Sequence, residues 1–196
     1  MTNAAKISAR IAELEADLEA EFEKELSAKR REFRYSLAQG RAEFEREMAV
    51  IHRRLRLGWV AFLMEAPLLS LLVAPVIYSL FIPVALFDAW LWVYQSVCFP
   101  AYGIEKVARS HYVALDRRHL PYLNWIERFN CDYCGYANGV IAYAREIASR
   151  SEQYFCPIKH SRRCRGTHAR YGDFVDFGDA EEYRRNWKKL RAELKP

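Results

Sequence analysis

The fold is decided by LGWVAFLMEAPLLSLLVAPVIYSLFIPVALFDAWLWVYQSVCFPAYGI, the stretch from Leu57 to Ile104. It contains two formally charged side chains, Glu65 and Asp88, whereas both flanks are dense in charge. One crossing of a bilayer needs about 20 apolar residues, and this stretch is more than twice that long. Its length therefore predicts two transmembrane helices, near 58–78 and 83–102, joined by a short turn.

Basic residues stand on both sides of this stretch. Arg53, Arg54 and Arg56 come before it, and Lys106, Arg109, Arg117 and Arg118 come after it. Positive side chains favour the cytosolic side of a membrane, so two crossings with a turn near Ser79–Pro83 would place both termini in the cytosol. This predicts a multi-pass protein of a bacterial-type inner membrane. Pro67, Pro75 and Pro83 favour an alternative, a re-entrant hairpin that enters the bilayer without crossing it.

The two carboxylates of the apolar stretch raise a functional alternative. Ionisable side chains within a membrane often mark an ion or proton path, so Glu65 and Asp88 would suit a transport accessory subunit. Each of them, however, lies near the end of its predicted helix, where it can reach the interface or pair with another charge. We favour this second interpretation.

Residues 1–56 differ from the apolar stretch in composition and pattern. From Ala4 to Leu57 they contain strong helix formers, one glycine (Gly40) and no proline. The apolar positions are Ile7, Ile11, Leu14, Leu18, Phe22, Leu26, Phe33, Leu37, Phe44, Met48, Ile51 and Leu55. Spacings of three and four residues alternate at both ends of this series, as in a coiled coil. We expect one long coiled-coil helix that forms a homo-oligomer, or else packs on the C-terminal region of its own chain.

Four of the five cysteines lie close together in the sequence after the apolar stretch. Cys131 and Cys134 form a CxxC motif, and Cys156, His160 and Cys164 follow it. Because these residues are expected in a reducing compartment, metal ligation is favoured over disulfide formation. Thiolates and imidazoles in two such pairs are typical ligands of tetrahedral zinc.

Helical spacing between the two groups, over residues 140–154, would bring the chain back to complete the site. The motif therefore predicts a small helical module, residues 105–165, held together by zinc. Its predicted ligands are Cys131, Cys134, Cys156 and His160, with Cys164 as the substitute for the histidine.

The sequence CDYCGY at 131–136, together with Cys156-Pro157, resembles the half-sites of rubredoxin. The resemblance implies iron instead of zinc and a role in electron transfer. It covers about ten residues, and this chain departs from the family because His160 and Cys164 stand where a second CxxC belongs. Thiol–disulfide exchange is a further alternative, since a helix start after the motif would make a thiol reactive. It lacks the surrounding strands that such enzymes have, and four buried cysteines without a shared partner remain a third possibility.

The tail, residues 166–196, is predicted to be irregular, with a short charged helix near Ala180–Leu194. Its basic residues are Arg184, Arg185, Lys188, Lys189 and Arg191. They suit phospholipid head groups or the acidic N-terminal helix at least as well as nucleic acid, which we do not expect as a partner. No glycine-rich phosphate loop, Ser-His-Asp order or pair of catalytic carboxylates stands out, so an enzyme is not favoured.

These observations predict an all-α membrane protein with four parts. They are a coiled-coil helix (1–56), a transmembrane hairpin (57–104), a metal-stapled helical module (105–165) and an irregular tail (166–196). The predicted function is that of a membrane-anchored scaffold or adaptor, which self-associates and recruits a cytosolic protein through a zinc-stapled module. A thiol-redox or iron electron-transfer protein and a transport accessory subunit are the alternatives.

Overall fold

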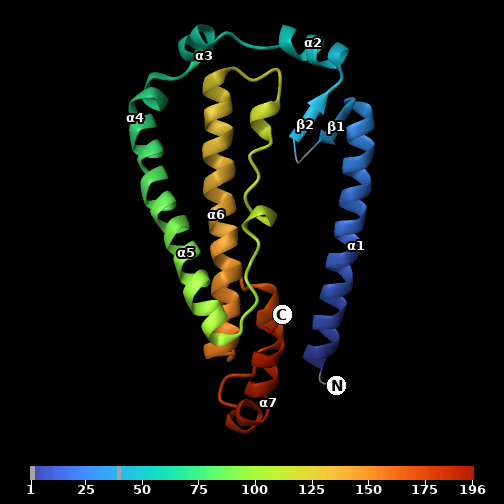
Figure 1. Cartoon of the computed structure of the whole chain (residues 1–196), viewed down its shortest axis with the longest axis vertical. Helices are drawn as coiled ribbons and strands as arrows, with labels where there is room; N and C mark the ends of the chain where they lie inside the picture. Colours follow the sequence, from blue (N-terminus) through green and yellow to red (C-terminus); the bar gives the residue numbers. More distant parts are fainter. Residues whose placement is uncertain (1–2, 39–40) are drawn as a thin grey trace. The chain divides into compact units, whose positions relative to one another are not determined.

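A computed structural model describes residues 3–38 and 41–196 of the chain, which are mostly helical (Figure 1). The helices are α1 (Asn3–Glu32), α2 (Arg46–Arg54), α3 (Trp59–Glu65), α4 (Leu68–Ser79), α5 (Phe81–Tyr102), α6 (Trp125–Phe155) and α7 (Ala180–Ala192). Two short strands, β1 (Tyr35–Ala38) and β2 (Arg41–Phe44), form an antiparallel hairpin. Short 3-10 turns cover Arg109–His111, Arg117–His119 and Ala169–Asp173. The predicted helical class is confirmed.

The described chain divides into two compact units. Unit 1 comprises residues 3–15, 86–112 and 140–196, and unit 2 comprises residues 16–85 and 113–139. Because α1, α5 and α6 each contribute residues to both units, the units do not correspond to the four consecutive parts predicted from the sequence.

The two-helix hairpin predicted for residues 57–104 is not confirmed. α4 and α5 meet at Leu80, whose backbone is right-handed helical at φ −62° and ψ −21°, so the chain does not reverse there. Together they make one segment of 35 residues, Leu68–Tyr102, that is long and apolar enough to cross a membrane. Pro83, which was expected to mark a turn, lies in the first turn of α5. A proline is tolerated there because the first N–H groups of a helix have no intrahelical partner.

The continuous helix predicted for residues 1–56 is interrupted by the β-hairpin. α1 ends shortly before Arg34, which adopts a left-handed φ of 48°. The strand register then pairs Tyr35 with Phe44, and their ring centroids lie 5.3 Å apart. Cross-strand aromatic pairs stabilise such hairpins, and this pairing competes with the helical pattern. Gly40, which the sequence shows between the two strands, lies outside the described residues.

In unit 2, α4 and the start of α5 pack against the first part of α6. The Tyr78 hydroxyl donates a hydrogen bond to Asn130 Oδ1, and the ring of Phe81 lies 5.3 Å from that of Tyr136. The later residue of α4–α5 contacts the later residue of α6, so the two helical elements run parallel here. Parallel helices need a long connection between the end of one and the start of the next.

The return segment, Gly103–Asn124, supplies that connection between α5 and α6. In unit 2 it is held by an ion pair of 2.9 Å between Arg118 and Asp132. A Cβ atom at Gly135 would lie 3.1 Å from the carbonyl oxygen of Ala114. The glycine after the CxxC motif therefore allows the return segment to approach α6 closely, and does not form a metal-binding turn.

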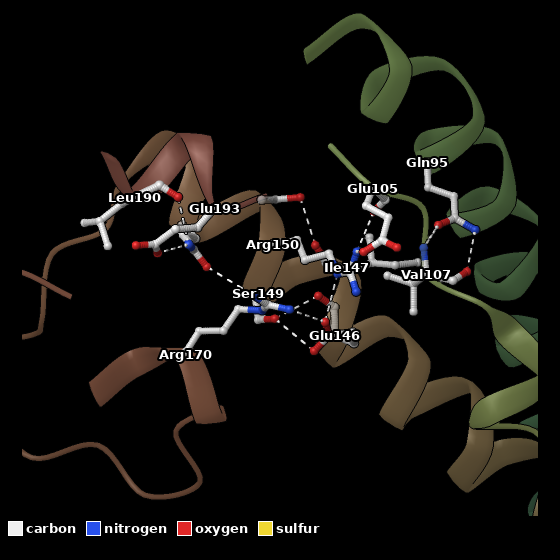
Figure 2. Close-up of polar contacts among 12 residues, drawn as sticks. Gln95, Glu105, Val107, Glu146, Ile147, Ser149, Arg150, Arg170, Leu190 and Glu193 are labelled. Carbon is white, nitrogen blue, oxygen red and sulfur yellow. Dashed lines mark hydrogen bonds and ion pairs between the residues drawn. The ribbon is translucent and has the colours of Figure 1, made fainter. Parts of the chain in front are cut away.

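Unit 1 has an apolar core with a polar clamp beside it. The core residues are Phe99, Ile104, Val107, Val140, Tyr143, Ile147, Phe174, Val175, Leu190 and Leu194. Gln95 of α5 is 6% exposed, and its Oε1 accepts a hydrogen bond of 3.0 Å from the backbone N–H of Val107. Its Nε2 donates to the Val107 carbonyl oxygen, as Figure 2 shows. The same Nε2 donates to the Tyr143 hydroxyl. One amide thus joins α5, the return segment and α6.

Candidate functional site

The CxxC motif lies within a helix. Cys131 and Cys134 both belong to α6 in unit 2, and the Asn138 side chain donates 2.9 Å to the carbonyl oxygen of Cys134. Cys131 is partly exposed and Cys134 is exposed. The expected knuckle is therefore wrong: residues three apart on a helix share a face, and their spacing here is that of a helix.

The second group of predicted ligands lies in unit 1, beyond the end of α6. α6 continues from Cys134 to Phe155, which is about 30 Å of helix at 1.5 Å per residue. Cys156 follows directly and is exposed, and all five cysteines are free thiols. The described residues contain no group of three His, Cys, Asp or Glu side chains arranged to hold a metal ion. The structure does not bring the predicted ligand set together.

Two of the predicted ligands, His160 and Cys164, do share a cavity. We call it the polar pocket, a hollow of about 280 Å³ between the second half of α6 and the loop that follows it. It is lined by Arg145, Ala148, Ser149, Glu152, His160, Cys164, Arg165, Gly166, Thr167, His168 and Tyr171. Cys131, Cys134 and Cys156 do not line it.

The loop that follows α6 is held in place by hydrogen bonds between its backbone and the side chains of Arg145 and Tyr171. Arg145 of α6 donates to the carbonyl oxygens of Gly166, at 3.1 Å, and Thr167. The Tyr171 hydroxyl accepts 2.6 Å from the His160 N–H. Gly166 has a φ of 71°, a left-handed conformation that favours glycine and turns the chain between Cys164 and the next histidine.

His168 is the most informative side chain of the pocket. Its Nε2 lies 2.9 Å from Glu152 Oε2, whereas its Nδ1 is buried and has no partner among the described residues. A carboxylate on one ring nitrogen favours the tautomer with a free lone pair on the other nitrogen. His168 can therefore accept a proton or bind a metal ion through Nδ1.

Next to the pocket, Glu146 lies between two arginines. Arg150 Nε lies 2.8 Å and Arg170 Nη2 2.9 Å from Glu146 Oε1, as Figure 2 shows. Burial by itself would raise the pKa of Glu146, but the hydrogen bonds and charges of both arginines outweigh it and lower the pKa below its ordinary 4.5. Arg150 also donates to the Glu105 carbonyl oxygen, so this network ties α6 to the return segment.

The Glu146 network predicts a loss of stability in acid. Because the folded-state pKa is depressed, its contribution is complete above about pH 4.5 and is lost as the pH falls through the lower folded value. Chemical denaturation from neutral pH to well below 4.5 should show a falling free energy of unfolding. Glu146→Gln should weaken this dependence, whereas Glu181→Gln, at an exposed position of α7, should leave it unchanged.

The sequence reasoning found His160 and Cys164 but missed Glu152 and His168. A pattern that could have found them is the charge of the loop. Residues 153–172 contain no Asp or Glu, whereas they contain Lys159, Arg162, Arg163, Arg165 and Arg170. In a loop without carboxylates, the negative groups of a site have to come from elsewhere, here from Glu146 and Glu152 of α6.

Comparison of the chain with known protein families, proteins and structures gives no match. The chain matches no protein-family model, no curated protein and no solved structure.

Proposed function

We propose that the chain is a membrane-associated adaptor that lies on one side of the bilayer and presents unit 1 to a cytosolic protein. The observation that carries this proposal is the apolar segment Leu68–Tyr102, whose most apolar part is not buried inside the protein. An exposed apolar surface of this length marks contact with a membrane or another protein.

The two faces of α5 support an in-plane position over a crossing. Its inward face carries Asp88, Leu91, Gln95 and Phe99 at helical spacing, and the last three are buried. Its outward face is apolar and exposed, with relative exposures of 68% at Leu86, 69% at Trp90 and 65% at Val97. Because the inward side of α5 packs within unit 1, only its outward side is free to contact lipid, and this one-sided contact is what we propose at the membrane surface.

The return segment supports the same position. It is irregular and packs along α5 in unit 1, where Arg109 forms a bidentate ion pair with Asp88. Its neighbours Glu105 and Lys106 are exposed. Irregular backbone and exposed charges do not occur against the lipid of the hydrocarbon core, so this side of α5 is proposed to face water.

Basic residues near the apolar helices fit an anionic lipid surface. The last turn of α2 carries His52, Arg53 and Arg54, and Arg56 follows it. Clusters of this kind are attracted to anionic head groups by about 1 kcal/mol per residue. We place both termini on the cytosolic side of a bacterial-type inner membrane.

Self-association through α1 is part of the proposal. Its apolar positions stay exposed, with relative exposures of 60% at Ile7, 70% at Leu18 and 61% at Phe22. A 30-residue helix with such a stripe is suited to pair with a second copy. Analytical ultracentrifugation in detergent should show a dimer or larger oligomer, which Leu18→Glu with Phe22→Glu should reduce to the monomer.

Accessibility in sealed inverted vesicles tests the topology. Protease added outside these vesicles, which is their cytosolic face, should remove the tags at both the N- and the C-terminus. A single crossing would protect one of the two tags. A cysteine introduced at Leu80 in a Cys-free background separates the two remaining arrangements. A complete hairpin would expose it to an impermeant maleimide from the opposite face, and that result would overturn the in-plane proposal.

Zinc remains a second candidate, at the polar pocket and with a changed ligand set. The observation that favours it is the carboxylate–histidine pair of Glu152 and His168 with its unpartnered Nδ1. His160 and Cys164 would complete such a site if the loop closed on it. We expect His168→Asn to lower the zinc content of the purified protein, and Cys131→Ser or His119→Asn to leave it unchanged. A loss of zinc with Cys131→Ser would restore the original ligand set.

A further inference from the structure

Unit 2 contains a second cavity, of about 270 Å³, which we call the aromatic pocket. It is formed by the end of α1, the β-hairpin, α2 and the return segment. Its lining residues are Phe33, Tyr35, Phe44, His52, Asp116, Arg117, Leu120 and Tyr122. Four of these eight are Phe or Tyr, and none of the predicted zinc ligands is among them.

The rings of this pocket form a connected series. Centroid distances are 5.3 Å from Tyr35 to Phe44, 5.0 Å from Phe44 to His52 and 5.4 Å from His52 to Tyr122. The contacts on either side of His52 are edge-on, at 67° and 85°. In each edge-on contact the edge of one ring meets the face of the other, and a ring face that no other ring covers carries the negative potential that attracts cations.

An ammonium group already lies on one of the lining rings. Lys29 Nζ is 5.5 Å from the centroid of the Phe33 ring, within the range of a cation–π contact. This lysine also pairs with Glu32 at 2.6 Å, which holds it on the side of α1. One lining ring therefore makes a cation–π contact within the chain, although Lys29 itself does not line the pocket.

Two side chains of opposite charge stand at the same pocket. Asp116 and Arg117 are exposed, and the side chain of neither forms a hydrogen bond or ion pair with any residue that the structure describes. Their position is fixed by the next residue, Arg118, through its ion pair with Asp132. A buried His52 Nδ1 without a described partner adds one more polar group.

We propose that the aromatic pocket binds the trimethylammonium group of a small zwitterion such as phosphocholine. The rings and Asp116 hold the cation, and Arg117 pairs with the anionic group. The volume of about 270 Å³ lies just below the usual range for ligand pockets, roughly 300–1,000 Å³, which suits a head group and not a larger molecule. The same chemistry is offered by free phosphocholine and by a phosphatidylcholine head group.

Calorimetric titration of the full-length protein in a non-choline detergent tests whether binding depends on the positive charge of the ligand. The probe is phosphocholine, and the control is 3,3-dimethylbutyl phosphate, which has the same shape with carbon in place of the charged nitrogen. We expect phosphocholine to bind about tenfold more tightly, because only the cation gains from the ring faces. Equal affinities, or no binding of phosphocholine, would overturn the proposal.

Variants of the lining separate ring chemistry from shape. Tyr122→Leu should remove the preference for phosphocholine over its neutral analogue, and Tyr122→Phe should retain it. Asp116→Asn should weaken phosphocholine binding several-fold without changing that of the analogue. Phe177→Leu, at an exposed aromatic residue of unit 1, is the matched control and should leave both affinities unchanged. A Tyr122→Leu protein with the full preference would contradict the assignment.

Vesicle flotation then identifies the source of the ligand. Wild-type protein that prefers phosphatidylcholine over phosphatidylethanolamine vesicles, both of which are zwitterionic, with the preference lost in Tyr122→Leu, assigns the pocket to the lipid head group. Phosphocholine binding without a vesicle preference assigns it to the free zwitterion. Because the apolar helix contributes equally to both kinds of vesicle, this comparison does not depend on the membrane proposal.

Discussion

Glutamates on the outward face of α5 should release the protein from membranes. We expect the triple variant Leu86→Glu, Trp90→Glu and Val97→Glu to move from the pellet to the supernatant after vesicle sedimentation. Each of these exposed apolar side chains contributes about 1.5–3 kcal/mol when it enters an apolar phase. Losing three of them costs at least about 5 kcal/mol, or more than a thousandfold in partitioning.

The control for charge places three glutamates elsewhere. Ala16, Ala20 and Ala28 are exposed positions of α1, so their triple replacement by glutamate adds the same net charge without touching α5. It should sediment with the vesicles as the wild type does. If the α5 variant also stays in the pellet, with its helix content unchanged by circular dichroism, the outward face of α5 is not the membrane contact.

The local helical segments near the C-terminus were predictable. Apolar spacing after residue 140 gave the end of α6 correctly, near Tyr154, and the second helix was expected at Ala180–Leu194 and is found at Ala180–Ala192. α7 begins where Asp179 accepts a hydrogen bond from the Glu182 N–H. Such capping lies within a few neighbouring residues, which is why the sequence shows it.

The errors arose where one pattern permits two structures. An apolar stretch twice the length of one crossing predicts a hairpin, but it also suits one long helix that contacts protein on one side. CxxC spacing suits a metal-binding turn and equally one face of a helix. The sequence of Tyr35 to Phe44 alternates in a way that a helical pattern can hide, and the contacts that decide among these structures come from distant residues.

The polar pocket shows the same limit. His160 and Cys164 were expected to combine with Cys131 and Cys134, which lie in the other unit. Their neighbours in the structure are Glu152, a loop-facing residue of α6, and His168, which was assigned to an irregular tail. Which carboxylate meets which imidazole depends on how the loop folds back onto α6, and spacing along the chain does not contain that information.

Replacing Gln95 with leucine should destabilise the protein severely. Whether the melting temperature falls or rises decides whether this face of α5 contacts protein or lipid. In the structure the leucine would leave three polar groups unpaired, namely the N–H and carbonyl of Val107 and the Tyr143 hydroxyl. Each costs about 1–3 kcal/mol, so the three together correspond to a fall of roughly 6–36 °C in melting temperature at about 2–4 °C per kcal/mol. A Gln95 side chain that faced lipid would give the opposite result, because leucine is favoured there.

A double-mutant cycle with Tyr143→Phe isolates the contact that joins α5 to α6. Removing the hydroxyl in the Gln95→Leu background also removes one unpaired group, so the double variant should be more stable than the sum of the two single effects predicts. Thermal melts of the four proteins in the same detergent measure this coupling. Strict additivity would mean that Gln95 and Tyr143 do not interact, and a Gln95→Leu protein more stable than the wild type would place this face of α5 in the bilayer. Because the clamp holds the return segment at Val107, its loss should also loosen the neighbouring Glu105–Arg150 contact. Hydrogen exchange at residues 104–109 should therefore rise in Gln95→Leu and much less in Tyr143→Phe.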